Sequence, residues 1–420
     1  MLSCDIEYNG SEQQQSKKHT MVKYMKLFLL IVVNVLIQSQ YWSIAKATSS
    51  ESTDVRNRAD SLKNAKSFAD AIPLYDSLLV QQIDQFENLV SKGECQAQIG
   101  EINQSLETFK LAIAIDSANA GLWKSIGDAY LFANLPQSAI KSYTRSIQLN
   151  GANSKTYSSL GAAYQRLNHV DTAERAFKKA LEIDSMNHEA WYNWSLLLHT
   201  KGSVDQAMQC LKRSISSKED FAPAFNNLGM LYYGAGFPDS ALASFNAAIL
   251  LDKQNALYYN NAGLACLDKR DTLTAYNFFK NALRYDSMNV KALYNAGLTS
   301  YFLLQYKDGI QFITKALQQQ PNVPDYWYTL GLIHASSNEK HLASGYWLKC
   351  MSLDSSNSSY SYAIGSLYDD NSPVKREYYT ISASLGNEKA KTWLIANPVK
   401  TEILSEPKKT ETKKSKKKKK

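Results

Sequence analysis

The sequence is poor in cysteine and histidine and lacks the short motifs that mark most enzymes. Its 420 residues include five Cys and six His, and none of them forms a CxxC, an HExxH or a Cys–His spacing typical of a metal site. A phosphate-binding glycine loop, GxGxxG and GxSxG are also missing. Four scattered Cys after the N-terminal segment do not indicate a disulfide-stapled fold. We therefore expect no catalytic residue, no metal ion and no cofactor.

The body of the chain also lacks net charge, although the whole chain carries +8 at pH 7. Residues 400–420 hold ten Lys and three Glu, which gives +7, and residues 1–47 hold five Lys and three acidic residues, which gives +2. The remaining segment, 48–399, is left with −1. A nucleic-acid-binding body normally carries its own basic stripe, so no specific nucleic acid partner is expected.

A long apolar run is missing as well. The longest stretch, Leu27 to Ile37, contains Asn34 and is too short for a membrane span, which needs about 20 residues. Two Lys precede it, and the small-x-small sequence AKA follows at positions 45–47, as in a secretory signal peptide. We expect residues 1–47 to be a leader and signal peptide, with export to the periplasm, the cell envelope or the exterior. An uncleaved membrane anchor is the alternative.

What the sequence does contain is a repeat. Ten windows of 34 residues, from Ser52 to Lys391, tile the chain without insertion or deletion. The eighth position of eight windows is glycine: Gly93, Gly127, Gly161, Gly229, Gly263, Gly297, Gly331 and Gly365. The twentieth position is small in nine windows, and the twenty-fourth is bulky and apolar in all ten, from Tyr75 through Phe279 to Ile381. A fixed period of this length is the signature of a repeat architecture.

Each window reads as two helices. In the third window, one face carries Trp123, Ile126, Gly127 and Tyr130 at i, i+3, i+4 and i+7. A second face follows with Ala139, Tyr143, Ser146 and Ile147. Glycine costs about 1 kcal/mol in a helix interior, so its recurrence indicates that two helix axes approach closely at this point.

The pattern resembles the tetratricopeptide repeat, with its W-x2-L-G-x2-Y and A-x3-F-x2-A motifs. The resemblance covers Ser52 to about Lys391 and weakens in the first and last windows. In the last window, Glu377 replaces the small residue and Pro373 stands at the inter-helix turn. It implies an all-α fold, a right-handed superhelical solenoid of about ten 34-residue helix-turn-helix repeats. The expected domains are an array with a capping helix over 48–397 and a disordered Lys-rich tail over 398–420.

The turns between windows depart from the family. Its proline after the second helix occurs only as Pro321. Instead, Asn occupies the last position of six windows: Asn119, Asn153, Asn187, Asn255, Asn289 and Asn357. An Asn placed there can cap the helix that follows, so we expect six capped helix starts.

The resemblance also implies where a partner binds, because the family's inner groove is lined by positions two, five, six, nine, twelve and thirteen of the first helix. Position six carries a row of asparagines: Asn193, Asn227, Asn261 and Asn295. Their amides match the donor and acceptor pattern of a peptide backbone. The row resembles the asparagine ladder in the repeat domain of O-linked N-acetylglucosamine transferases, although the catalytic domain of those enzymes is missing here. Tyrosines flank the row at positions five and twelve: Tyr192, Tyr233, Tyr294, Tyr301 and Tyr328.

Two interpretations of these residues remain open at this point. The asparagines and tyrosines either form a peptide-binding row, or they follow a habit of the family and pack between adjacent repeats. The carboxylate-binding clamp of some members is not assembled, because Lys124 has Asp128 at position nine and Ser159 in the next window. Cys266 and Cys350 fall at helix-contact positions and are expected to be buried, inert and unpaired, and His334 is expected to be a packed core imidazole.

The function predicted from these features is that of a non-catalytic scaffold or adaptor that binds proteins or peptides in its groove. The alternative is a non-catalytic subunit of an envelope polysaccharide or polymer assembly machine. The Lys-rich tail either contacts an anionic surface or serves as a solubilising end.

Overall fold

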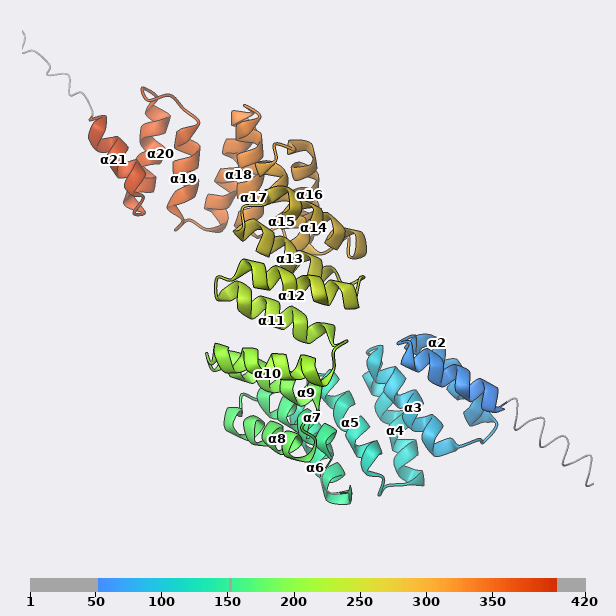
Figure 1. Ribbon diagram of the computed structural model, residues 1–420. Coiled ribbons are helices and arrows are strands. Elements are labelled where there is room, and N and C mark those ends of the chain that lie inside the picture. Colours follow the sequence, from blue (N-terminus) through green and yellow to red (C-terminus); the bar gives the residue numbers. More distant parts are fainter. Residues whose placement is uncertain (1–51, 151–152, 399–420) are drawn as a thin grey trace, which may run out of the picture. The chain divides into compact units, whose positions relative to one another are not determined.

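The computed structural model describes residues 52–150 and 153–398, and every regular element among them is an α-helix (Figure 1). The expected signal peptide, residues 1–47, and residues 399–420 of the Lys-rich tail lie outside this part of the chain. None of the described helices is both long and apolar enough to cross a membrane. The all-α prediction is confirmed.

The chain divides into two compact units, Met1–Ser217 and Lys218–Lys420. The first unit contains a helix over residues 52–64 and then α2 (Phe68–Val80), α3 (Gln85–Gln98), α4 (Ile102–Ile115), α5 (Ala120–Phe132), α6 (Pro136–Asn150), α7 (Ser154–Arg166), α8 (Val170–Ile183), α9 (His188–Thr200) and α10 (Val204–Ser217). The second contains α11 (Ala222–Gly234), α12 (Pro238–Leu251), α13 (Ala256–Asp268), α14 (Thr272–Tyr285), α15 (Val290–Phe302), α16 (Tyr306–Gln319), α17 (Pro324–Ser336), α18 (Lys340–Leu353), α19 (Ser358–Ser366), α20 (Pro373–Ser384) and α21 (Glu388–Ala396).

These helices form the predicted repeats. Each 34-residue window holds a first helix, with an odd label from α3 to α19, and a second helix, with an even label. The helix over residues 52–64 and α2 make the first such pair, and α21 follows the last. The two helices of a pair pack against each other, as do the second helix of one repeat and the first helix of the next within each unit.

The glycine at position eight brings the two helices of a repeat together. A Cβ on Gly263 would lie 2.5 Å from Cε1 of Phe279, whose side chain is fully buried. The same relation joins Gly161 to Phe177. Non-bonded carbon atoms prefer a separation of about 3.5–4.0 Å, so a methyl group does not fit here without movement. The recurring glycine thus makes room for the bulky residue at position twenty-four.

The turns between repeats are fixed by two kinds of side chain. All six predicted asparagine caps are present, with each Oδ1 accepting a backbone N–H from the first turn of the next helix. The indole at position four holds the same turn from the other side, because Trp123 Nε1 donates to the Ser117 carbonyl at 2.9 Å and Trp327 Nε1 donates to the Pro321 carbonyl at 2.8 Å. The prediction of asparagine capping is confirmed.

The last repeat departs from the predicted register. Ile381 was expected to fill the space beside Gly365, but Tyr379 does so and is only 4% exposed. The first helix of this repeat, α19, has nine residues instead of thirteen, and Pro373 opens α20 one position early. A shift of two residues along α20 also leaves Glu377 at the surface, where a carboxylate avoids the cost of unpaired burial.

The array ends on α21, which covers the exposed side of α20. The Trp393 ring meets Tyr379 edge-on, with the ring centroids 5.0 Å apart. The cationic groups of Lys375 and Arg376 both lie over the indole, at 5.4 and 5.5 Å from its centroid. A terminal repeat needs such a cover, because it has no neighbour to bury its outer apolar side.

Candidate functional site: the first-helix face

The first helices of successive repeats form a row in each unit. In the first unit α3 contacts α5, α5 contacts α7 and α7 contacts α9, and in the second unit α11 contacts α13 and α15 contacts α17. We call the side chains at positions two, five, six, nine, twelve and thirteen of these helices the first-helix face. This face carries every residue of the predicted binding site.

The asparagines at position six bond to the repeat before them. Asn261 Nδ2 donates to Asn226 Oδ1 at 2.8 Å, and Asn295 Nδ2 donates to Asn260 Oδ1 at 3.0 Å. In the first unit, Asn193 Nδ2 makes the same contact with the hydroxyl oxygen of Ser158, at 3.5 Å. Position six of one repeat therefore binds position five of the repeat before it, a partnership that the sequence analysis did not foresee.

These hydrogen bonds limit what the asparagines can offer a ligand. Asn261 is buried, with 6% of its surface exposed, whereas Asn193, Asn227 and Asn295 are half-buried. Asn227 also accepts a hydrogen bond from Asn226 Nδ2 at 3.2 Å. The row thus has a structural role between repeats, and the half-buried amides keep a partly accessible edge.

The predicted tyrosines divide into two groups. Tyr294 packs against Tyr326 of the next repeat, with ring centroids 5.2 Å apart, and Tyr328 packs against Tyr360 at 5.7 Å. Burial raises the pKa of both Tyr294 and Tyr328 above the ordinary phenol value. These two tyrosines are half-buried, and so are the other three, Tyr192 at position five and Tyr233 and Tyr301 at position twelve.

Apolar side chains surround these tyrosines in the second unit. Met230 at position nine is 41% exposed, Leu257 at position two is 47% exposed and Phe302 at position thirteen is 59% exposed. Position nine remains apolar in the following repeats, with Leu264, Leu298 and Leu332. The first-helix face of this unit is therefore a mixed surface of aromatic, aliphatic and amide groups, with the exposed charged residues Lys291 and Asp325 at position two and Asp268 at position thirteen.

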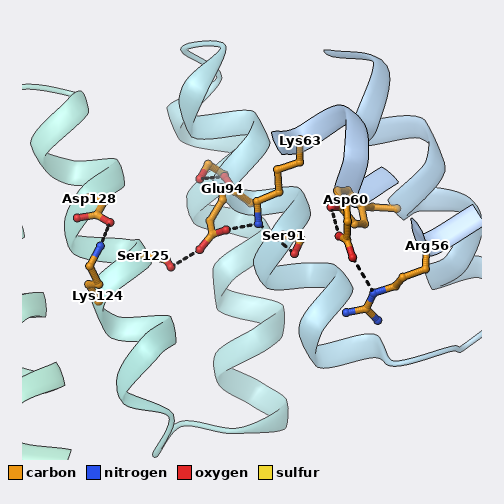
Figure 2. A network of polar contacts seen from close by, with 11 residues as sticks. Arg56, Asp60, Lys63, Ser91, Glu94, Lys124, Ser125 and Asp128 are labelled. Atoms are coloured by element: carbon orange, nitrogen blue, oxygen red, sulfur yellow. Dashed lines mark hydrogen bonds and ion pairs between the residues drawn. The ribbon is translucent and has the colours of Figure 1, made fainter. Parts of the chain in front are cut away.

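In the first unit, the same face is charged at its N-terminal end. Position nine is a carboxylate in the first three repeats, where Asp60, Glu94 and Asp128 follow one another at the 34-residue period. Each has a basic partner: Arg56 lies beside Asp60, Lys63 binds Glu94 and Lys124 binds Asp128 (Figure 2). Only the pair of Lys124 and Asp128 was predicted from the sequence, although the carboxylate recurs at position nine in three successive repeats.

A hydroxyl group fixes each of these carboxylates. Tyr143 donates its phenol proton to Asp128 Oδ1 at 2.8 Å, and Tyr75 does the same to Asp60 at 2.7 Å. The Ser125 hydroxyl takes this role for Glu94, as Figure 2 shows. Burial, reinforced by the neighbouring carboxylate, raises the pKa of Tyr75 and of Tyr143 well above the usual range. A buried phenol needs such a partner, and the carboxylates supply it to the Tyr at position twenty-four of the first and third repeats.

A cavity of about 390 Å³ opens among these charged groups. Its walls include Lys63, Lys66, Glu94 and Asp128, together with the exposed ring of Phe132. Because both signs of charge line it, the cavity selects no simple ion. We regard it as part of the first-helix face of the first unit.

The remaining candidates for chemistry are packed away from solvent. Cys95, Cys210, Cys266 and Cys350 are buried free thiols, and burial raises the pKa of Cys350 to about 12. Cys350 Sγ donates to the Pro324 carbonyl at 3.3 Å. Cys266 and Cys350 are buried and unpaired, as predicted. A raised thiol pKa opposes nucleophilic reactivity.

His334 is also packed as predicted, with 8% of its surface exposed and its ring against that of Tyr346 at 5.3 Å. Its Nδ1 makes a short contact with Glu339. No group of three or more His, Cys, Asp or Glu capable of holding a metal ion occurs within residues 52–150 and 153–398.

Comparison with known proteins agrees with this architecture. The family model described as tetratricopeptide repeat matches residues 158–220 and 226–275. These two segments are therefore tetratricopeptide repeats. The matched segments lie in the fourth to seventh repeats. No match was found among curated proteins.

Three solved structures are similar to this chain to different degrees. One from the Cut9–Hcn1 hetero-tetramer of the APC/C has a TM-score of 0.51 and 18% identity over 71% of this chain and 59% of that chain. Pseudomonas aeruginosa PilF has a TM-score of 0.46 and 16% identity over 50% of this chain and 96% of that chain. YrrB, described as having an unusual peptide-binding site, has a TM-score of 0.34 and 23% identity over 44% of this chain and 95% of that chain. Likeness at these identities concerns the fold alone.

Proposed function

We propose that this tetratricopeptide repeat protein is a non-catalytic scaffold that binds a protein or peptide partner on its first-helix face. Repeat solenoids present extended surfaces and commonly act by binding. The buried state of the four described thiols and of His334 also supports a binding role over a catalytic one.

The observation that carries the proposal is the composition of the first-helix face in the second unit. Met230, Leu257 and Phe302 are well exposed there, and Tyr233 and Tyr301 lie half-buried at position twelve. Aromatic residues and methionine are enriched in protein interfaces, and tyrosine combines a rigid apolar ring with a polar end. This set supports recognition of a peptide with apolar side chains.

The asparagines take a secondary part in this proposal. Asn193, Asn227 and Asn295 keep a partly accessible amide edge that can meet the main chain of an extended segment. Asn261 is buried against Asn226, so we assign it to the contact between repeats. Removing the accessible amides should therefore weaken binding, whereas removal of Asn261 should mainly affect stability.

The experiment is a site-specific photo-crosslinking series in the native host. A photoreactive phenylalanine analogue replaces Tyr233 or Tyr301 on the first-helix face, and in the matched control it replaces Leu250, which is 72% exposed on the second helix α12. We expect one protein adduct from the first two positions and none from the control. Equal adducts at all three positions would contradict the proposal.

A purified partner found in this way then allows a direct measurement. Tyr301→Ala and Phe302→Ala should each raise the dissociation constant about tenfold or more, since central aromatic anchors contribute over about 1 kcal/mol. Leu250→Ala should leave it unchanged. Circular dichroism of each variant confirms that the fold is retained.

Export of the protein is a separate proposal that rests on residues 1–47. Cell fractionation, followed by mass spectrometry of the N-terminus, tests it. A mature chain beginning at Thr48 in an exported fraction supports cleavage after Ala47, and an intact N-terminus in a membrane fraction supports the anchor. Recovery of the intact chain in the cytosol alone would contradict both.

A further inference from the structure

A second cavity lies away from the first-helix face, among α4, α5 and α6 of the first unit. It measures about 340 Å³, within the range that holds small-molecule ligands. Most of its lining is apolar: Leu106, Phe109, Ile113, Trp123, Ile126 and Tyr130. The remaining lining residues are Ser138, Ser142 and two lysines, Lys110 and Lys141.

Position twenty-three of the third repeat carries a small residue, Ser142, which lines the cavity. Later repeats place an aromatic side chain there: Phe278, Phe312 and Tyr346. In the ninth repeat, Tyr346 stacks on Trp327 of position four, with ring centroids 5.8 Å apart. In the third repeat, position four is Trp123 but position twenty-three is Ser142, so no such ring fills the space beside the indole.

The indole wall of the cavity is held in place. Trp123 Nε1 donates to the Ser117 carbonyl at 2.9 Å, which fixes the ring against the turn. Ser142 directs its hydroxyl to the Ser138 carbonyl at 3.1 Å, within its own helix. The cavity is therefore a shaped apolar recess, and its own polar groups are largely satisfied.

The charged residues that line the cavity are both positive. Lys110 from α4 and Lys141 from α6 are exposed, and no Asp or Glu is among the lining residues. Lys110 pairs with Glu107 at 2.6 Å, but both side chains are well exposed, at 66% and 70%. Exposed ion pairs contribute about 0–1 kcal/mol, so an anion can recruit Lys110 at little cost.

We propose that this cavity binds a small amphipathic acid, with the alkyl chain in the recess beside Trp123 and the carboxylate between Lys110 and Lys141. The apolar walls account for the chain, and the two ammonium groups account for the head group. This site is independent of the proposed partner-binding face, because Trp123, Ile126 and Tyr130 of α5 lie at positions four, seven and eleven, outside that face, and α4 and α6 are second helices. It adds a small-molecule site to the proposed scaffold.

The test uses decanoate as the probe, below its micelle concentration, with the full chain. Isothermal titration calorimetry measures binding, and quenching of tryptophan fluorescence by 10-bromodecanoate reports the position of the chain. Trp123→Phe identifies the part of the quenching that belongs to Trp123. We expect saturable binding with one site, and quenching that is largely lost in Trp123→Phe.

Two filling variants copy residues that the chain itself uses at the same repeat positions. Ser142→Phe follows Phe278 and Phe312, and Ser138→Leu follows Leu342. Both should abolish decanoate binding. Ser244→Phe makes the same substitution at position twenty-three in the second unit and should leave binding unchanged. Thermal unfolding of each variant verifies the fold, and Ser138→Leu keeps the test decisive if Ser142→Phe does not fold.

The head group is tested separately. Lys110→Gln with Lys141→Gln should weaken decanoate binding about tenfold or more, the value expected for losing hydrogen bonds from charged donors. Arg175→Gln, one repeat further on at the position of Lys141, is the matched control and should have no effect. Decanol or decyltrimethylammonium binding as tightly as decanoate would overturn the proposal, as would absence of saturable binding or its persistence in a folded filling variant.

Discussion

The close contact at position eight leads to a quantitative prediction for Gly263→Ala. The new Cβ would lie 2.5, 2.8 and 2.9 Å from three ring atoms of the fully buried Phe279. Alanine gains about 1 kcal/mol over glycine in a helix interior, whereas an extra methyl group in a packed core costs about 1–3 kcal/mol. The gain in helix propensity and the cost of overpacking oppose each other, so a control variant that has the propensity gain alone is needed.

Gly345→Ala is that control. Gly345 lies inside α18, and a Cβ added there meets nothing within 4 Å. This variant should gain about 0.5–1 kcal/mol from helix propensity alone. Because the propensity gain cancels in the comparison, Gly263→Ala should be about 1–3 kcal/mol less stable than Gly345→Ala.

Urea unfolding followed by circular dichroism gives the free energies of unfolding. A repeat array can unfold in parts, so hydrogen exchange of α13 and α14 should accompany the measurement. Phe279→Leu should relieve the penalty of Gly263→Ala, since the fifth repeat combines Ser195 with Leu211 at the same two positions. Equal stability of the two alanine variants would refute the close-packing argument.

Four further results are expected. Asn289→Ala should lose about 1 kcal/mol in urea unfolding, because its Oδ1 accepts from Ala292 N at 3.1 Å, whereas Asn289→Asp should retain most of the stability. Hydrogen bonds from Lys178 and Lys201 lower the pKa of Glu174 in the folded protein. The ionised carboxylate therefore stabilises the fold above the ordinary carboxyl pKa of 4.5, and this stabilisation is lost as the pH falls through the lower folded pKa. Glu174→Gln should destabilise the protein at pH 7 and have little effect at pH 2. Cys350 should resist a thiol reagent at pH 8 until the protein unfolds, since burial raises its pKa to about 12. Deleting residues 407–420 should reduce retention on anionic vesicles in low salt if the Lys-rich tail contacts such surfaces, and unchanged retention would assign the tail another role.

Much of the fold follows from local rules that can be read in the sequence. Gly263 and Phe279 recur at fixed positions because each repeat solves the same packing problem, and Asn289 marks a turn because its side chain caps the next helix. These relations lie within one or two repeats. Periodicity alone therefore predicts the helix pairs, the buried positions and the caps.

The last repeat was harder to predict because its register depends on competing local preferences. Pro373 fixes the start of α20, and Glu377 avoids the buried contact that the 34-residue count assigns to it. The result is that Tyr379 replaces Ile381 in the core. A count of positions cannot anticipate a two-residue shift of this kind.

The placement of the candidate site residues was predicted in part, and their role in binding stays a prediction. The sequence placed the asparagines in one row, but not the hydrogen bond from Asn261 to Asn226, which requires the geometry of two adjacent helices. The sequence also contained the carboxylates at position nine, whose significance becomes clear only beside Tyr75 and Tyr143. Side-chain partnerships across helices are thus the information that periodicity does not supply.

The central claim is that a protein partner binds the first-helix face of the second unit. Photo-crosslinking from Tyr301, with Leu250 on α12 as the control position, tests it most directly. We expect a protein adduct at Tyr301 that is lost when Phe302 is also changed to Ala, and no adduct at Leu250. An adduct of the same protein from Leu250, or none from Tyr301 and Tyr233 in the native host, would contradict it.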